Sequence, residues 1–294
     1  MIIVKLVGGL GNQMFQYAAG KQLSALHNTE LKIDPSFYLN KFPSGVTPRE
    51  IELDLLNTKL NFATQEEIDY FSKSKNNRYQ RWLHRKVPVL FNKIYLSESG
   101  SDFSSLFFRS PKNTYLDGYW QTEKYFSKIR SVLVQEFQPK NEFSSDNLNY
   151  LSKIKSENSV SVHFRRGDYV SNPNAASYHG VLPLSYYDNA VNLLSTRLKN
   201  PEFFVFSDDI PWVIENFKIP FPVHFVQGNQ GKSAVFDLAL MYSCKHNIIA
   251  NSSFSWWGGW LNTNPEKIVV APKNWFSGSY DIPNDLIPAK WVIL

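Results

Sequence analysis

A pair of adjacent arginines near the middle of the chain carries the strongest chemical signal in the sequence. Residues 160–164 alternate β-branched and other side chains, which predicts a strand, and Arg165, Arg166 and Asp168 follow it directly, with Gly167 breaking the chain direction. Arginine stays charged at physiological pH and offers five donors in a planar fork, so a pair at a strand end suggests a phosphate or carboxylate ligand. The alternative is a surface ion pair with Asp168.

The elements that position these arginines form a regular pattern in the second half of the chain. Strand-like and helix-like segments alternate, which predicts a parallel sheet covered by helices on both faces. In such sheets ligands bind outside the carboxyl ends of the strands. The expected strands are 160–164, 203–206, 223–226, 248–250 and 268–270, and the expected helices are 184–198, 211–217, 233–242 and 255–261.

Polar residues follow four of these strands. They are found at 163–168, 207–209, 251–253 and 272–275. This coincidence favours a ligand site over scattered surface residues, and it adds Asp208 and Asn251 to the candidate ligand contacts. The chain shows no Cys/His cluster and no Asp-x-Asp pair of the kind that holds Mg²⁺ against a diphosphate, so we expect no metal.

The start of the chain predicts a second place for an anion. Residues 2–7 are apolar enough for a buried strand, a glycine-rich turn at 8–13 comes next, and residues 14–26 have helical spacing. A strand, glycine turn and helix let backbone N–H groups approach an anion, although such a turn is often structural alone. Further on, a strand is expected at 115–121 and a helix at 123–137.

Composition places the chain among globular proteins. Hydrophobic residues make up 43% and charged residues 19%, and no apolar stretch is long enough to span a bilayer. The single cysteine, Cys244, excludes internal disulfides and fits a reducing compartment. The sequence has no secretory leader pattern at its start, so we expect a cytoplasmic protein.

The net charge of +5 is unevenly distributed. Seven Lys or Arg and no acid lie between residues 73 and 93, interleaved with aromatic residues. This segment could bind an anionic membrane surface or an anionic carrier, which would place the protein peripherally on the inner face of the plasma membrane, or it could be a solvated helix face. Nothing else in the chain resembles a nucleic-acid-binding module, so no nucleic-acid partner is expected.

Five segments, taken together, resemble the motifs of glycosyltransferase family 11, the bacterial α-1,2-fucosyltransferases. The resemblance covers the chain from residue 8 to about 275 in the family's order. It implies an α/β fold of GT-B architecture, in which two Rossmann-like domains with parallel sheets, 1–155 for the acceptor and 156–294 for the donor, face a central cleft. The extreme C-terminus could pack back on the first domain. The segments are 8–16, 118–121, 163–169, 206–209 and 251–259.

The resemblance also implies an activity. It is inverting transfer of L-fucose from GDP-β-L-fucose to the 2-hydroxyl of a β-galactoside, in O-antigen or capsule synthesis, with no metal or other cofactor. Without a metal, fixed cations must stabilise the diphosphate leaving group, and Arg165 matches the arginine that binds the β-phosphate, supported by Arg166. The alternatives are a related transferase for another nucleotide sugar and a non-catalytic nucleotide-sugar-binding protein.

Other roles come to this chain through the same resemblance. The proton of the acceptor hydroxyl would pass to Asp168, to His179 or to no protein group, and Asp168 could instead hold the arginines in place. Ser253 could be a simple helix N-cap instead of a phosphate ligand. The implied donor contacts are His163 and Asp237 at the guanine and nucleotide, Ser253 and Ser255 at the phosphates, and Gly9, Gly11 and Asn12; the implied acceptor contacts are Tyr119, Trp120, Gln121 and His179.

Overall fold

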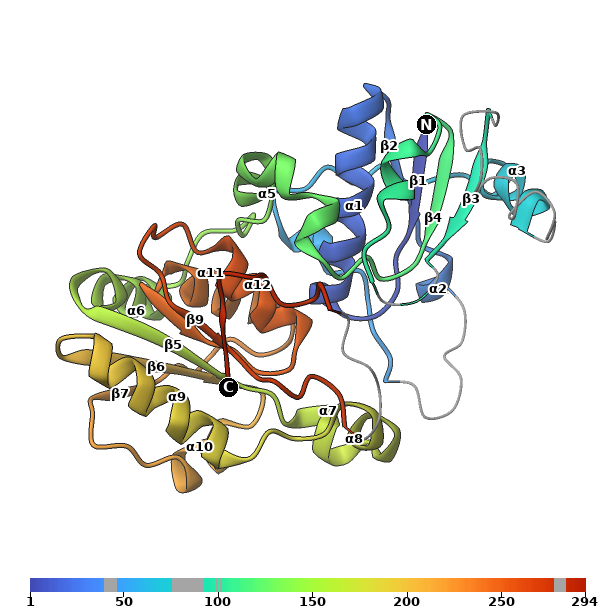
Figure 1. Ribbon diagram of the computed structural model, residues 1–294. Coiled ribbons are helices and arrows are strands. Elements are labelled where there is room, and N and C mark those ends of the chain that lie inside the picture. The colour runs from blue at the N-terminus through green and yellow to red at the C-terminus, as the bar shows by residue number, and fades with distance from the viewer. Residues whose placement is uncertain (40–46, 76–91, 99, 101, 278–283) are drawn as a thin grey trace. The chain divides into compact units, whose positions relative to one another are not determined.

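The computed structural model describes residues 1–294 except 40–46, 76–91, 99, 101 and 278–283, and it divides into two compact units (Figure 1). The first unit takes in the described residues of 1–42, 48–137 and 283–288, and the second those of 43–47, 138–282 and 289–294. The division after Phe137 comes earlier than the expected boundary at 155, because helix α6 (Ser145–Ser156) packs against helix α11 (Ala234–Ser243) of the second unit.

The first unit is built on a parallel sheet with the strand order β2-β1-β4-β3. Helix α1 packs against β1 and β2, and its first turns are almost entirely buried. The described elements are β1 (Ile2–Lys5), α1 (Leu10–His27), β2 (Leu31–Asp34), α2 (Ser36–Leu39), η1 (Leu53–Leu55), α3 (Gln65–Lys75), β3 (Ile94–Ser97), η3 (Ser105–Arg109), β4 (Thr114–Asp117), η4 (Glu123–Tyr125), η5 (Ser127–Ile129) and α5 (Arg130–Glu136).

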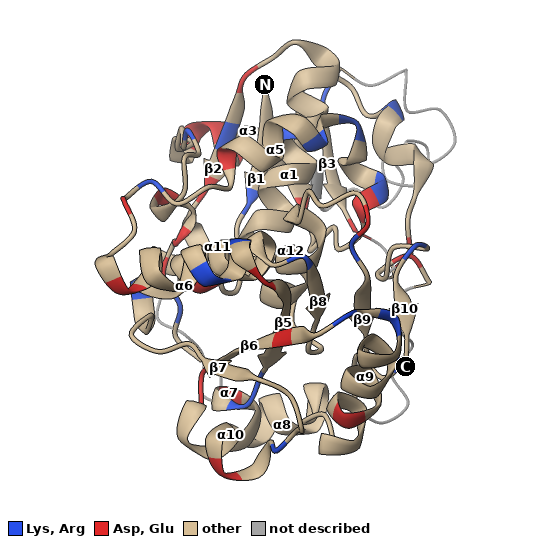
Figure 2. Ribbon diagram, turned by 90° about the vertical axis from the view of Figure 1, so that its left-hand side faces the viewer, with Lys and Arg blue, Asp and Glu red and all other residues tan. Residues whose placement is uncertain are grey.

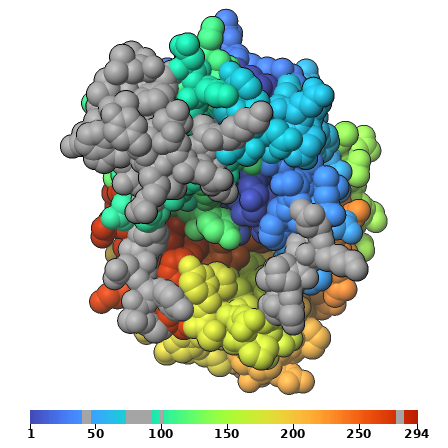
Figure 3. Space-filling model, turned by 90° about the vertical axis from the view of Figure 1, so that its right-hand side faces the viewer, coloured from blue at the N-terminus to red at the C-terminus, as the bar shows by residue number. Residues whose placement is uncertain are grey.

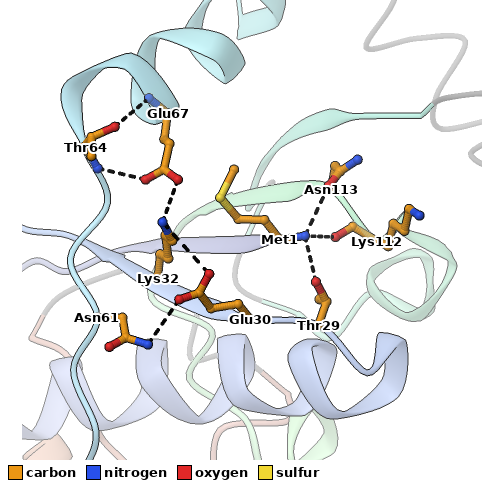
Figure 4. Close-up of polar contacts among 9 residues, drawn as sticks. All are labelled: Met1, Thr29, Glu30, Lys32, Asn61, Thr64, Glu67, Lys112 and Asn113. Carbon is orange, nitrogen blue, oxygen red and sulfur yellow. Dashed lines mark hydrogen bonds and ion pairs between the residues drawn. The ribbon is translucent and has the colours of Figure 1, made fainter.

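Hydrogen bonds from the first residue fasten the amino ends of three neighbouring strands (Figure 4). The ammonium group of Met1 donates to Thr29 Oγ1 at 2.8 Å, just before β2. It also donates to the carbonyl of Lys112 at 2.9 Å and to Asn113 Oδ1 at 3.1 Å, just before β4. These contacts help to set the register of β1 between its two partners.

Helix α3 begins with a reciprocal cap, also visible in Figure 4. The N–H of Thr64 donates to Glu67 Oε2 at 2.9 Å, and the N–H of Glu67 donates to Thr64 Oγ1 at 3.3 Å, which is a capping box. Glu67 Oε1 also lies 2.6 Å from Lys32 Nζ on β2. One carboxylate therefore caps the helix and ties it to the edge strand of the sheet.

The second unit contains a larger parallel sheet with the strand order β10-β9-β8-β5-β6-β7. Helices α11 and α12 cover one face, and α9 and α10 cover the other (Figures 1 and 2). Its elements, besides α6 and α11, are β5 (Asn158–Phe164), α7 (Gly167–Ser171), α8 (Pro173–His179), α9 (Leu184–Arg197), β6 (Pro201–Ser207), α10 (Ile210–Asn216), β7 (Val223–Phe225), η6 (Gly231–Ser233), β8 (His246–Ile248), α12 (Ser253–Leu261), β9 (Val269–Ala271) and β10 (Val292–Ile293).

Two buried clusters fill the second unit. Aliphatic and aromatic side chains of β5 and β6 pack against α9, and the ring of Phe164 stacks on Tyr187 with 3.8 Å between centroids. Three tryptophans of α12 pack on one another, and one of them, Trp256, also packs on Trp291. Much of the high tryptophan content is therefore core packing and not a sugar-binding surface.

The alternation of strands and helices expected for the second half is confirmed, and three other expectations need correction. The strand expected at 248–250 is β8 at 246–248, and α1 begins at Leu10, four residues earlier than expected. Residues 123–137 do not form one helix. Phe126, with φ −141° and ψ 6°, interrupts the segment, so two short 3₁₀ turns precede α5.

Candidate active site

Arg165 lies just past the end of β5, between two carboxylates. Its Nη2 is 2.6 Å from Asp168 Oδ1, and its Nη1 is 2.8 Å from Asp208 Oδ2 at the end of β6. Burial alone lowers the pKa of Arg165, but the carboxylates of Asp208 and Asp168 raise it above its ordinary value. The ion pair with Asp168 considered above is thus present, and a second carboxylate helps to hold the guanidinium fork in a fixed orientation.

Arg166 is also held in place by the end of β6. Its backbone N–H donates to Asp208 Oδ1 at 2.8 Å, and its Nε is 3.1 Å from Asp209 Oδ2. The guanidinium carbon lies 3.4 Å from the ring centroid of Trp212, a cation–π contact. Asp208 approaches so closely that a Cβ on Gly167 would lie 2.5 Å from its Oδ2, so a side chain at 167 would disturb the carboxylate. Asp208 thereby positions both arginines, and its expected contact with the donor stays a prediction.

His163, the candidate guanine contact, is 5% exposed and packs against Phe254 at 5.7 Å between ring centroids. Its Nδ1 is buried and has no hydrogen-bond partner among the described residues. Burial lowers the pKa of His163 to about 4, with a further lowering by Arg165 and an opposing effect of Asp208. The imidazole is therefore neutral at pH 7, and its expected contact with guanine stays a prediction.

The two candidate phosphate-binding serines differ in position. Ser253 is the first residue of α12 and is partly exposed, while Ser252 is the N-cap and accepts from the N–H of Phe254. Ser255 is fully buried, and its hydroxyl donates to the carbonyls of Ala250 and Ser252. A phosphate contact thus fits the location of Ser253 but conflicts with that of Ser255, and the N-cap role weighed for Ser253 belongs to its neighbour.

Asp237, the other candidate nucleotide contact, lies in the first turn of α11 within a network of amides. Asn229 donates to Asp237 Oδ1 at 2.8 Å and exchanges two hydrogen bonds with the side-chain amide of Asn147. Burial raises the pKa of Asp237 to about 7, although the hydrogen bond from Asn229 opposes the shift. The carboxyl is thus partly protonated near neutral pH.

We expect Asp237→Asn to raise the melting temperature, by an amount that grows as the pH is raised from about 4 to 8. In this range the folded protein holds a proton on Asp237 that the unfolded chain releases, so ionisation destabilises the wild type as pH rises, and asparagine removes that cost. Thermal unfolding of both proteins across pH tests this. A constant difference in melting temperature at every pH would contradict the raised pKa.

Asn251 lies past the end of β8 and fastens two loops. Its Nδ2 donates to the carbonyl oxygens of His179 at 2.9 Å, Gly180 at 3.2 Å and Trp275 at 3.2 Å, and the residue is 1% exposed. Its own carbonyl accepts from the hydroxyl of Tyr169 at 3.2 Å. The amide nitrogen of Asn251 is therefore occupied by backbone, while its Oδ1 is buried without a hydrogen-bond partner among the described residues, and the expected donor contact stays a prediction.

The expected anion site at the start of α1 already receives a carboxylate. The N–H of Leu10 donates to Glu52 Oε2 at 3.0 Å, and Gly9 is the N-cap. Gly11 and Asn12 lie in the first helical turn and not in a loop as expected. Glu52 thus supplies the negative charge that a helix N-terminus favours, without any ligand.

The candidate acceptor residues of the first unit form a tight turn after β4. The N–H groups of Tyr119 and Trp120 both donate to Glu98, and Trp120 has φ +56°. Trp120 is only 2% exposed and packs among aromatic rings, so it cannot stack on a sugar as expected, whereas Tyr119 is 49% exposed. Gln121 donates to Asn12 Oδ1 at 2.9 Å, which joins a candidate acceptor contact to a candidate donor contact.

Several residues that contribute to these sites could not be singled out from the sequence. Glu52 and Glu98 are single acids in unremarkable surroundings, and only the fold brings them to backbone N–H groups. Trp212 and Phe254 pack on Arg166 and His163 from separate helices. Tyr169 was easier to find from the sequence, because it lies within the segment 163–169 that carries the arginines.

The described residues contain no group of three or more His, Cys, Asp or Glu placed to hold a metal ion, and the expected independence from metals stays a prediction. Within the same residues, no helix combines the length and apolar character that crossing a bilayer requires. The basic segment expected at a membrane surface lies mostly at 76–91, outside the described residues.

Two bacterial proteins resemble this chain along nearly its whole length. An α-1,2-colitosyltransferase of Escherichia coli is 38% identical over 299 residues, which cover 99% of this chain and 98% of that protein. The O-antigen biosynthesis glycosyltransferase WbnK of Escherichia coli is 35% identical over 286 residues, which cover 93% of this chain and 94% of that protein.

A solved structure supports the fold. An Arabidopsis thaliana FUT1 mutant in complex with GDP matches 94% of this chain and 71% of its own, with a TM-score of 0.52 and 12% identity. The predicted GT-B class, with a parallel Rossmann-like sheet in each unit, is thereby confirmed, while the facing of the two units across a cleft stays a prediction. The family model for glycosyl transferase family 11 matches residues 1–294, and the chain belongs to this family, as its motifs predict.

Proposed function

We propose that this family 11 glycosyltransferase transfers L-fucose from GDP-β-L-fucose to the 2-hydroxyl of a β-galactoside, with inversion and without a metal, during O-antigen synthesis. The observation that carries the proposal is the full-length family match combined with the fixed Arg165 fork at the carboxyl edge of the second sheet. The α-1,2 linkage agrees with the name of the colitosyltransferase, and the O-antigen role with that of WbnK.

The chemistry of the second unit supports a nucleotide-diphosphate leaving group. As the bond to the sugar breaks, negative charge develops on the diphosphate, and preorganised cations at that point lower the barrier. Arg165 is permanently charged and its orientation is set by Asp168 and Asp208. The GDP in the complex of the Arabidopsis protein supports a guanine nucleotide, for which His163 and Asp237 are the proposed contacts.

Colitose is the second candidate for the transferred sugar. It is supported by the 38% identity to an α-1,2-colitosyltransferase, whereas the motifs described above favour fucose. Colitose is fucose without its 3-hydroxyl. A site built to hydrogen-bond that hydroxyl rejects the sugar lacking it by a large factor, so the two donors are distinguishable by rate.

Donor and acceptor identity are tested in one assay. The purified protein is mixed with GDP-fucose or GDP-colitose and a panel of β-galactosides, and both GDP release and the linkage of the product are followed. We expect acceptor-dependent GDP release, a 1,2-linked product and full activity in excess EDTA. If colitose is transferred faster than fucose, colitose replaces fucose as the proposed donor sugar. Nucleotide binding without transfer of either sugar would identify a binding protein, and a requirement for Mg²⁺ or Mn²⁺ would contradict the metal-free mechanism.

A further inference from the structure

A cavity of about 410 Å³ opens in the second unit, beside the end of α8. Its volume lies within the range of small-molecule sites. It lies beside the segment that follows β9, at the sheet edge where ligands of parallel sheets bind. Its wall includes polar and aromatic side chains, among them His179, Ser185, Asn189, Lys273, Ser277 and Phe276.

The two loops that form the cavity are held rigidly together. Asn251 binds the carbonyls of His179 and Gly180 on one loop and of Trp275 on the other. The N–H of Ser277 also donates to the carbonyl of Tyr178 at 2.9 Å. A preformed wall of this kind lowers the ordering cost of binding a sugar ring.

His179 connects the cavity to the arginine site. Its imidazole lies flat on the ring of Tyr169, with 4.6 Å between centroids and an interplanar angle of 3°. The guanidinium carbon of Arg165 is 5.4 Å from the centroid of the same tyrosine ring. The imidazole of His179, which lines the cavity, and the guanidinium of Arg165 therefore both lie against the ring of Tyr169.

The two candidate proton acceptors are not equivalent in this geometry. Asp168 Oδ1 is paired with Arg165 at 2.6 Å, so this carboxylate already holds the guanidinium fork in place. His179 Nδ1 has no hydrogen-bond partner among the described residues. The segment carrying both groups, α7 and α8, lies at the molecular surface (Figure 3), where His179 is partly exposed although its Nδ1 is buried.

We propose that His179 is the catalytic base and that the sugar carrying the acceptor hydroxyl binds in the cavity that His179 lines. This inference rests on the proposed transferase function. The acceptor oxygen forms the bond to the anomeric carbon, and the bond from that carbon to the β-phosphate oxygen breaks, its electron pair leaving with GDP. The hydroxyl proton passes to a ring nitrogen of His179, which later releases it to water.

The charges around His179 make its basicity depend on the donor. Burial lowers the pKa of the free imidazole to about 4; Arg165 lowers it further and Asp168 opposes the lowering, while Lys273 lines the same cavity. The imidazole is therefore neutral at pH 7 and able to accept a proton. A diphosphate bound at Arg165 adds negative charge nearby, which raises the pKa of His179 and makes it a stronger base when the donor is present.

Three protein variants test the base. We expect His179→Gln to lower kcat for transfer by about 100-fold or more, with GDP affinity changed by no more than about twofold. Asp168→Asn should weaken GDP binding instead, because it loosens Arg165. Added imidazole should partly restore transfer by His179→Ala. In the wild type, kcat should fall as the pH drops through the pKa of His179, and this acidic limb should be absent in His179→Gln.

The cavity is tested with a matched pair on helix α9. Asn189→Leu changes a cavity-lining side chain and should raise the KM of the acceptor about tenfold, while Asn192→Leu, an exposed neighbour outside the cavity, should not. Transfer by His179→Gln at the wild-type rate would contradict the proposal that His179 is the base. An unchanged KM of the acceptor in Asn189→Leu would contradict the proposal that the acceptor sugar binds in the cavity. A raised KM for the donor alone would place the donor sugar in the cavity. A wild-type protein without any transfer would instead overturn the proposed function.

The pKa coupling has a readout independent of turnover. NMR titration of the His179 ring, assigned by comparison with His179→Gln, should give a higher pKa with GDP bound than without it. An unchanged or lowered pKa would contradict the proposed role of the diphosphate in strengthening the base.

Discussion

Replacing Arg165 by alanine is expected to lower kcat/KM by about 1000-fold, the largest effect of any substitution considered for this protein. The guanidinium is positioned by two carboxylates, at 2.6 Å and 2.8 Å, and the leaving phosphate is its proposed partner. Arg165→Lys should still lose about 100-fold, because lysine keeps the charge but loses the planar fork. Steady-state kinetics and GDP titrations measure both losses.

Loss of folding must be separated from loss of chemistry in these variants. Without Arg165, the carboxylates of Asp168 and Asp208 lose their shared cation, so the melting temperature is expected to fall at neutral pH. Circular dichroism should nevertheless show a folded protein. Arg197→Ala, at the exposed end of α9, removes the same charge and should leave the kinetics unchanged. Activity of Arg165→Ala within fivefold of the wild type would place the phosphate site elsewhere.

Asn251→Ala is expected to destabilise the second unit by about 3 kcal/mol, because it removes the donor that three loop carbonyls share. The catalytic rate should fall at the same time, since the segment carrying His179 loses one of its attachments to the loop after β9. Urea denaturation and kinetics on one preparation measure the two effects together.

A direct role of Asn251 at the donor would give a different result. If its amide bound the nucleotide, GDP affinity would fall while the free energy of unfolding stayed within about 0.5 kcal/mol of the wild type. Asn192→Ala is a suitable control, because this exposed asparagine on α9 lies outside the cavity.

Much of the second unit could be predicted from local sequence. The period of apolar residues and the polar residues after each strand depend only on near neighbours, so the parallel sheet and the polar groups at its carboxyl edge followed from them. The same reasoning failed at 123–137, where helical spacing continues but Phe126 leaves the helical conformation. Apolar spacing records which side chains face the core, and several short turns can present the same face as one helix.

The sequence alone determined the family and the place of Arg165 at a strand end, because motif order and strand periodicity are properties of the linear chain. Tertiary structure decided the partners: Asp208, which is 42 positions from Arg166, reaches both arginines only because β5 and β6 pair in register. It also buried Trp120, committed Asn251 to backbone carbonyls and placed His179 on Tyr169. Such contacts join distant segments, and their geometry depends on packing that no local pattern records.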